Sequence, residues 1–313
     1  MDQRFTTPFG AQSTASKVAA GIDLTGHRVV VTGATGGLGR ETARALASAG
    51  AEVTVTGRTL RTATAVAQDI TVETGNSLTR AARLDLAAPA SVAAFVADWR
   101  GPLHILVNNA GIMATPELRT PAGRELQFAT NHLGHFALTV GLHDALAAAR
   151  DARVVVVSSV GHVNGPVRFD DPDFVKEPYD PWLAYAQSKT ANVLFAVEAA
   201  KRWAADGIAV NALNPGRIWA TGLGRHMEAP PASFDPAGTS GVSEKTIAQG
   251  AATSVLLAAS PLVDGVTGRY FEDCREAGPH TPGVRRGVAA HAVDPDSARK
   301  LWDLSMLMTV SDR

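Results

Sequence analysis

Tyr185 and Lys189 are the residues whose types and spacing most clearly permit chemistry. They lie four positions apart in a strongly helical stretch, 182–205, and this spacing places both on one helix face with Cβ atoms about 6 Å apart. A tyrosine has an ordinary pKa of about 10, and a nearby ammonium favours its phenolate. Lowering that pKa by about three units requires roughly 4 kcal/mol. The pair therefore predicts a general acid/base that acts through Tyr185.

Two polar residues upstream could complete this site. Ser159 directly follows an apolar run, 153–158, so its hydroxyl is expected at the carboxyl edge of a sheet, where ligands bind. Its neighbour Ser158 is also a candidate, but side-chain alternation along a strand sends the two serines to opposite faces. Asn131 is the other residue; taken alone, it could simply bend the helix that carries it.

A glycine cluster stands earlier in the chain, between a strand and a helix. Gly33, Gly37 and Gly39 are spaced Gly-x-x-x-Gly-x-Gly between a strand expected over 28–32 and a helix expected over 38–49. In this context glycines allow a tight turn and let the backbone approach a pyrophosphate at the helix N-terminus. The cluster predicts a dinucleotide-binding site, although a purely structural turn would also recruit glycine.

The end of the second expected strand, 52–56, bears on which dinucleotide binds. NAD-specific sites commonly carry an acid there, which bonds the ribose 2′-hydroxyl. This chain has no carboxylate there and carries Arg58, whose guanidinium would complement a 2′-phosphate. Arg40 on the opening helix is a second candidate, and the alternative is that both arginines are solvated surface residues. We therefore expect NADP(H) as the preferred cofactor, with NAD(H) as the alternative.

Short apolar strands alternate with helices along most of the chain. Strands are expected over 28–32, 52–56, 78–85, 104–108, 153–158, 208–213 and 268–272, and helices over 38–49, 60–74, 88–99 and 182–205. This alternation predicts βαβ units with right-handed crossovers. The expected fold is therefore α/β: a Rossmann-type, doubly wound parallel sheet in a single three-layer α/β/α domain.

The expected domain spans 26–277, between an N-terminal extension, 1–25, and a C-terminal extension, 278–313. The C-terminal extension has a helical pattern over 296–308, and this helix could cap the substrate pocket or cover a neighbour. The segment 217–245 is rich in Gly, Pro and Ser and yet holds large apolar residues: Trp219, Leu223, Met227 and Phe234. Such a segment suits a substrate lid, and the alternative is a surface excursion.

Composition excludes several classes of protein. Lys plus Arg total 29 and Asp plus Glu total 30, so no charge bias draws the chain to nucleic acid or anionic lipid. Cys274 is the only cysteine, which rules out an intramolecular disulfide and a cysteine-rich metal site. His132, His135 and His162 lack a carboxylate partner at motif spacing, so no metal is expected. Residues 1–25 lack the apolar stretch of a signal peptide or membrane anchor, and we expect a cytoplasmic protein.

Four motifs stand in the order and spacing typical of one family. The glycine cluster, Asn108-Asn-Ala-Gly111, Tyr185-x-x-x-Lys189 and Asn214-Pro-Gly216 together make the chain resemble the short-chain dehydrogenases/reductases over about 26–271. The resemblance implies that Ser159 orients the substrate oxygen and that Tyr185 transfers the proton. It also implies that Lys189 bonds the nicotinamide ribose and that Asn131 holds a water in a proton relay to the lysine.

The same resemblance implies a set of cofactor contacts. They comprise the glycine turn, the ends of the next strands and the residues beside the nicotinamide: Gly33, Thr35, Gly37, Leu38, Gly39, Arg58, Asp85, Leu86, Asn109, Ala110, Gly111, Tyr185, Lys189, Pro215, Gly216 and Thr221. The hydride comes from the cofactor, so the protein contributes position and electrostatics.

Phe169-Asp-Asp171, together with the sequence 185–194, looks like the retinol dehydrogenase and protochlorophyllide reductase branch of the family. That branch implies NADP(H) and lipophilic substrates, although the membrane-anchoring segment of many retinol dehydrogenases is missing here. We expect an oxidoreductase that interconverts a carbonyl and an alcohol on a lipophilic small molecule. The alternatives are a reductase of an activated carbon–carbon double bond and a nucleotide-sensing protein without catalysis.

The oligomeric state stays open at this level. The family often pairs through the helices that carry Asn131 and the Tyr-Lys set, so a homodimer or homotetramer is one expectation. The small residues of the second helix would allow such close packing, but they would pack equally well against the sheet: Ala191, Ala196, Ala199 and Ala200.

Overall fold

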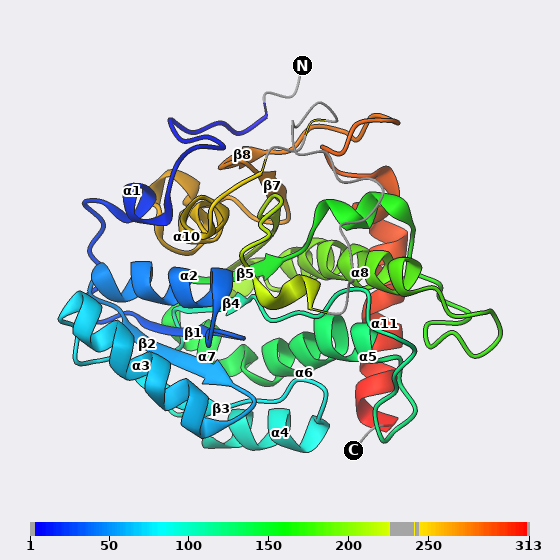
Figure 1. The fold of residues 1–313 in the computed structure, drawn as a ribbon, viewed down its shortest axis with the longest axis horizontal. Coiled ribbons are helices and arrows are strands. Elements are labelled where there is room, and N and C mark those ends of the chain that lie inside the picture. The colour runs from blue at the N-terminus through cyan, green and yellow to red at the C-terminus, as the bar shows by residue number, and fades with distance from the viewer. Residues whose placement is uncertain (1–3, 226–240, 242–243, 312–313) are drawn as a thin grey trace.

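One mixed sheet organises the chain in the computed structural model, which describes residues 4–225, 241 and 244–311 (Figure 1). The strand order is β3-β2-β1-β4-β5-β6-β7-β8. The strands are β1 (Arg28–Val31), β2 (Glu52–Gly57), β3 (Arg80–Arg83), β4 (Ile105–Asn108), β5 (Ala152–Val157), β6 (Ile208–Asn214), β7 (Tyr270–Glu272) and β8 (Arg275–Glu276). All neighbouring pairs are parallel except β7 and β8. The expected Rossmann-type sheet is confirmed, with the antiparallel β8 as an addition.

Helices cover both faces of this sheet. The α-helices are α1 (Ala15–Ala19), α2 (Gly37–Ser48), α3 (Leu60–Thr74), α4 (Pro89–Asp98), α5 (Leu126–Phe128), α6 (Gly134–Gly141), α7 (His143–Ala149), α8 (Pro181–Arg202), α9 (Ile247–Gly250), α10 (Ala252–Ala259) and α11 (Pro295–Ser311). A π-helical turn, η1, spans Ala129–Leu133, and 3₁₀ turns are η2 (Val160–Asn164), η3 (Ala204–Asp206), η4 (Gly222–Gly224), η5 (Pro261–Val263) and η6 (Ala290–Ala292). No helix within the described ranges is long and apolar enough to cross a membrane.

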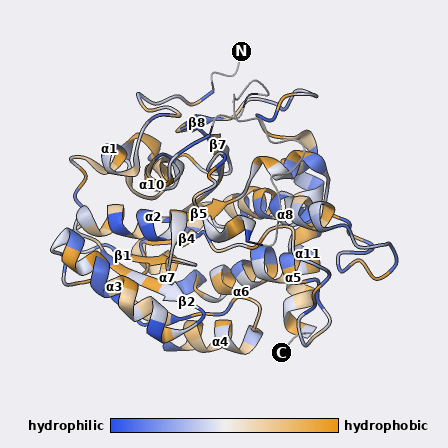
Figure 2. Cartoon of the chain, viewed as in Figure 1, coloured by the Kyte–Doolittle hydropathy of each residue, from blue (hydrophilic) through white to orange (hydrophobic). Residues whose placement is uncertain are grey.

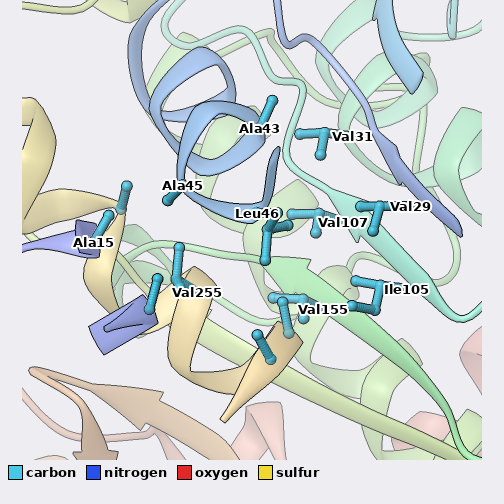
Figure 3. Packing of buried hydrophobic residues seen from close by; sticks show 14 of the residues in the cluster. Ala15, Val29, Val31, Ala43, Ala45, Leu46, Ile105, Val107, Val155 and Val255 are labelled. Carbon is cyan, nitrogen blue, oxygen red and sulfur yellow. The ribbon is translucent and has the colours of Figure 1, made fainter. Parts of the chain in front are cut away.

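Two hydrophobic cores lie on opposite faces of the sheet. On one face α1, α2, α3 and α10 pack over the strands; Leu46 of α2 and Val255 of α10 meet Val107 and Val155 there (Figure 3). On the other face α4, α6, α7 and α8 pack around residues such as Leu106. Runs of valine suit strands that are buried on both faces. The helices mix hydrophilic with hydrophobic residues, because only one side of each faces the sheet (Figure 2).

β3 is shorter than the strand expected over 78–85. It lies at the edge of the sheet, and none of its four residues is fully buried. Leu78 is 43% exposed, because only β2 lies beside β3 and the sheet does not continue past it. An edge position therefore explains why the apolar pattern extends further than the regular strand.

Both terminal extensions pack onto the domain. Phe5 and Phe9 lie against the first core, and the Phe5 ring meets Phe271 of β7 edge-on at 6.0 Å. At the other end, α11 packs across α8 (Figure 1), where its Leu301 belongs to the same hydrophobic cluster as Ala191 and its Trp302 reaches the second core. Of the two alternatives for the C-terminal helix, the structure shows the second, because α11 covers part of α8. Residues 226–240 and 242–243 of the expected lid lie outside the described residues.

Gly207 offers a test of the turn between α8 and β6. Its φ is +70°, and a Cβ there would overlap the carbonyl oxygen of Arg150. Gly265 has nearly the same φ, +73°, but open space around it. Gly207→Ala should lower the free energy of unfolding by about 3 kcal/mol or more, and Gly265→Ala by about 1 kcal/mol. Urea unfolding of both variants checks this, and equal losses would show that the Arg150 contact relaxes freely.

Candidate active site

A cleft of about 640 Å³ lies at the carboxyl ends of the central strands. All sixteen expected cofactor contacts line this cleft, from Gly33 after β1 to Thr221 after β6. Ser159 lines it as well. Open α/β sheets bind ligands where two neighbouring strands lead to helices on opposite faces of the sheet. The cleft lies at such a position, because β1 and β4 are neighbours and the helices that follow them cover opposite faces. Asn131 and Arg40 are the candidate residues that do not line the cleft.

The glycine turn is closed tightly against its surroundings. Gly37 has a φ of +53°, and a Cβ on it would meet the side chain of Thr221 at 3.3 Å. A Cβ on Gly39 would lie 2.6 Å from the carbonyl oxygen of Gly33 and would overlap the Asn109 amide. Any larger residue would therefore displace the backbone that faces the cleft.

A hydroxyl joins this turn to the end of β4. Thr32 Oγ1 accepts the backbone N–H groups of Asn109 and Ala110 at 2.8 and 3.0 Å. The same oxygen lies 2.8 Å from Nε2 of His135. The Asn109 side-chain amide donates back to the Thr32 carbonyl at 2.8 Å. These bonds fix the two loops that would hold the two halves of a dinucleotide.

The two candidate arginines differ in their surroundings. Arg58 is exposed at the rim of the cleft, and within the described residues its guanidinium makes no ion pair. Arg40 pairs with Glu73 on α3, away from the cleft lining. Arg58 is therefore the residue that is free to meet a 2′-phosphate.

Tyr185 is buried beside Ser159. Burial raises the pKa of Tyr185 to about 12, while a hydrogen bond with Ser159 and the charge of Arg285 act in the lowering direction. Ser159 Oγ also accepts the backbone N–H of Gly161 at 3.0 Å. A Cβ on Gly161 would lie 2.9 Å from the Tyr185 ring, so this glycine lets the ring approach the serine.

Lys189 lies one helical turn further along α8 and is also buried. Its ammonium donates to the carbonyl oxygen of Val157 at 3.1 Å, and burial lowers its pKa to about 8. Nζ lies 5.8 Å from the centroid of the Tyr185 ring. The sequence predicts that this ammonium lowers the tyrosine pKa. In the structure burial raises the pKa of Tyr185, and the charge that acts in the lowering direction is that of Arg285.

Asn131 lies in the π-helical turn behind the cleft. Its amide donates to the Ile112 carbonyl and to Ser188 Oγ, both at 2.9 Å, and its Oδ1 accepts the Ile112 N–H at 2.9 Å. Its carbonyl oxygen lies 2.9 Å from Nδ1 of His135. The residue does bend its helix, and it holds the strand-to-loop segment next to Lys189. Its expected part in a proton relay stays a prediction.

The three histidines considered as ligands each have a hydrogen-bond partner in the fold. His132 Nε2 lies 2.7 Å from Ser305 Oγ on α11, and His135 bridges Thr32 and the Asn131 carbonyl. His162 contacts the carbonyl oxygen of Ser159 at 2.7 Å. The sequence predicted structural histidines rather than metal ligands, and His135 and His162 directly support the loops of the cleft.

Some residues around the cleft carried no sequence signal. The loop after β4 and the start of α5 contribute an apolar wall to the cleft, made of Ile112, Leu118 and Leu126. Arg285, near the phenol, comes from the C-terminal extension, 100 positions away from Tyr185. No motif spacing joins these segments, and only the folded sheet brings them together.

Comparison with known proteins assigns the family. The short chain dehydrogenase family model matches residues 27–230, and the chain belongs to this family. It is 55% identical to a "Probable oxidoreductase" of Streptomyces antibioticus, over 90% of this chain and 97% of that protein. It is 38% identical to human retinol dehydrogenase 14, over 90% of this chain and 86% of that protein.

The fold is also similar to that of a solved structure. Gluconate 5-dehydrogenase from Burkholderia cenocepacia in complex with NADP and tartrate has a TM-score of 0.64 and 26% identity, covering 80% of this chain and 94% of that one. The chain is thus an oxidoreductase of the retinol dehydrogenase-like branch that acts on CH–OH groups of small molecules and uses NAD(P). The expected family, fold and class of enzyme are confirmed.

Proposed function

We propose that this oxidoreductase uses NADP(H) to interconvert a carbonyl and an alcohol on a lipophilic substrate, with Tyr185 as the general acid/base. The observation that carries the proposal is the buried Tyr185–Ser159 pair next to Lys189, in the same cleft as the glycine turn and Arg58. Nucleotide-binding proteins without catalysis have no need of a desolvated tyrosine and lysine at the end of their cleft.

In the direction of reduction, the Ser159 hydroxyl and the Tyr185 hydroxyl would both bond the substrate oxygen. NADPH supplies the hydride to the carbonyl carbon, and the oxygen takes the proton from Tyr185. A pKa raised by burial suits this role, because the phenol keeps its proton until negative charge develops on the oxygen. In oxidation Tyr185 would start as phenolate and take the proton of the alcohol. The charge of Arg285 would favour this phenolate, as would the positive nicotinamide of bound NADP⁺ before hydride transfer.

Lys189 would bond the nicotinamide ribose and accept or deliver protons behind Tyr185. Its pKa of about 8 lies near neutrality, so the lysine can exchange a proton at little cost. Asn131 would position the relay by holding the segment at Ile112. Asp85 and Leu86 border the cleft and would contact the adenine ring. Pro215 and Gly216 border it as well and would lie next to the nicotinamide.

The apolar wall at Ile112, Leu118 and Leu126 supports a lipophilic substrate body. We further propose that the enzyme works in the cytoplasm, which suits its one free, buried cysteine. A homodimer or homotetramer remains our proposal for its assembly. Since α11 covers the Ala191 side of α8, such pairing would have to include α11 itself.

Cofactor preference is the direct test of Arg58. Wild type should bind NADPH more tightly than NADH, and Arg58→Ala should reduce this preference about 10- to 100-fold, the value of a charge-assisted phosphate contact. Arg40→Ala is the matched control, because Arg40 is already paired with Glu73. Fluorescence titration of both cofactors against the three proteins measures it. An equal effect of the two substitutions, or tighter NADH binding by wild type, would remove the NADP(H) assignment.

A further inference from the structure

A hairpin-shaped loop, 278–288, lies in the C-terminal extension and is closed by a parallel bridge between Pro279 and Val288. His280 and Val288 are joined by a backbone bond of 2.8 Å, and the Val288 N–H donates to the Gly278 carbonyl at 2.8 Å. His280 Nδ1 lies 2.9 Å from the Arg286 carbonyl across the hairpin. Gly287 has a φ of +82°, and a Cβ there would lie 2.7 Å from the Gly278 oxygen, so the two arms approach as closely as glycine permits.

Two bonds attach this hairpin to the active-site end of the sheet. The Gly287 N–H donates to Glu272 Oε1 on β7 at 3.0 Å. The Ala289 N–H donates to His162 Nε2 at 3.1 Å, which leaves the proton of this imidazole on Nδ1, where it donates to the Ser159 carbonyl. The hairpin is thereby held to the same short turn that carries Ser159.

Arg285, near the tip of this hairpin, is an uncompensated cation. Within the described residues it forms no ion pair; its one hydrogen bond is a long one, 3.4 Å, to Asn164 Oδ1. Its Nε is buried without a partner. Burial and the neighbouring charge of Arg217 both lower the Arg285 pKa, while Tyr185 acts in the opposite direction. A guanidinium in this state gains from a bound anion, which would satisfy both its charge and its free N–H.

Two neighbouring cations share one carboxylate. Arg286 and Lys245 both pair with Asp273. These residues and Arg285 surround a small cavity that also touches Gly216, a residue of the main cleft. Arg285 is therefore next to the end of the cleft where Tyr185 stands, at the β6–β7 side of the sheet. Arg58, the candidate for the cofactor phosphate, lies after β2 on the other side of β1.

We propose that Arg285 forms a subsite for a carboxylate of the substrate, beside the carbonyl that Tyr185 protonates. The substrate class is then an oxo acid or hydroxy acid whose lipophilic part lies against Ile112, Leu118 and Leu126. A planar guanidinium suits a carboxylate, because two parallel N–H bonds can form. This inference rests on the proposed function, since it names the substrate class of the same site.

The test compares ketones that differ only in charge. The probes are 2-oxo-2-phenylacetate, 4-oxo-4-phenylbutanoate and 5-oxo-5-phenylpentanoate, each with its methyl ester, titrated by calorimetry into the full-length protein saturated with NADP⁺. In wild type at least one acid should bind about 10-fold or more tightly than its ester. Arg285→Gln should abolish this preference, Arg285→Lys should retain part of it, and Arg286→Gln, whose arginine is paired with Asp273, should keep it.

Each result decides the proposal. The proposed subsite would be overturned if wild type bound no acid more tightly than its ester. It would also be overturned if the preference survived Arg285→Gln, or if Arg286→Gln lost the preference equally. A loss of NADPH affinity in Arg285→Gln would also overturn it, since Arg285 would then serve the cofactor. Binding is measured without turnover, so failure of the redox assignment is distinguishable. If no acid, ester or neutral ketone is reduced with NADPH while the charge preference persists, the proposed function fails and the subsite stands.

Discussion

Tyr185→Phe is expected to lower kcat for carbonyl reduction by about 10²- to 10⁴-fold, the usual value of a general acid/base. The phenol is buried and hydrogen-bonded to Ser159, so the substitution removes the proton donor and leaves the ring in place. The dissociation constant for NADPH should change by less than about threefold, because Tyr185 is only one of the sixteen expected cofactor contacts in the cleft and the substitution keeps its ring. Single-turnover kinetics with NADPH and a binding titration together measure both quantities.

Tyr179→Phe is the matched control for that experiment. Tyr179 is another of only three tyrosines, and its hydroxyl accepts a hydrogen bond from the Gln127 amide at 2.9 Å, outside the cleft. Its loss should reduce kcat by far less than the loss of the Tyr185 hydroxyl. If Tyr185→Phe turned over every accepted substrate at the wild-type rate, Tyr185 would not be the proton donor. Equal losses in both variants would indicate a structural effect at this end of the sheet.

The fold was largely predictable, because its signals are local. Valine-rich runs such as 28–31 and 152–157 form strands buried on both faces, and helical stretches between them force parallel crossovers. The structure differs from the prediction where the position of a strand in the folded sheet determines its length. At β3 an edge limits the regular strand, and β8 is two residues long and pairs only because the chain turns back on β7. Neither property is visible in a sequence window.

The site was predictable where its residues share an element or a strand end. Tyr185 and Lys189 needed only the helical repeat, and the glycine turn needed only its strand and helix. The electrostatics of Tyr185 were not predictable, because they depend on burial and on Arg285 from a distant hairpin. The sequence predicted a lowered tyrosine pKa from the lysine and the cationic nicotinamide ring, whereas desolvation, which raises it, requires knowledge of what covers the ring.

Acid should destabilise this protein steeply. His132, His135 and His162 are fully buried, and burial lowers their pKa values to about 3, 4 and 4 from the ordinary 6.5. Between about pH 6.5 and pH 4 these histidines therefore bind protons in the unfolded chain but not in the folded chain. The contribution of the neutral histidines to the free energy of unfolding is therefore fully present above pH 6.5 and is lost as the pH falls toward 4. Each should cost roughly 2–3 kcal/mol by pH 4, which together rivals the whole stability of a typical domain.

Urea unfolding between pH 7.5 and 4.5 measures this loss. Near pH 5, unfolding should take up two to three protons through these histidines, which corresponds to a slope of about 3–4 kcal/mol per pH unit. His162→Gln should reduce the uptake by about one proton, because its amide can still accept the Ala289 N–H without titrating. A stability that stays constant from pH 6.5 to 5 would mean that the imidazoles are solvated. Because His162 also holds the Ser159 turn and His135 the Thr32 hydroxyl, protonation should loosen both loops of the cleft together.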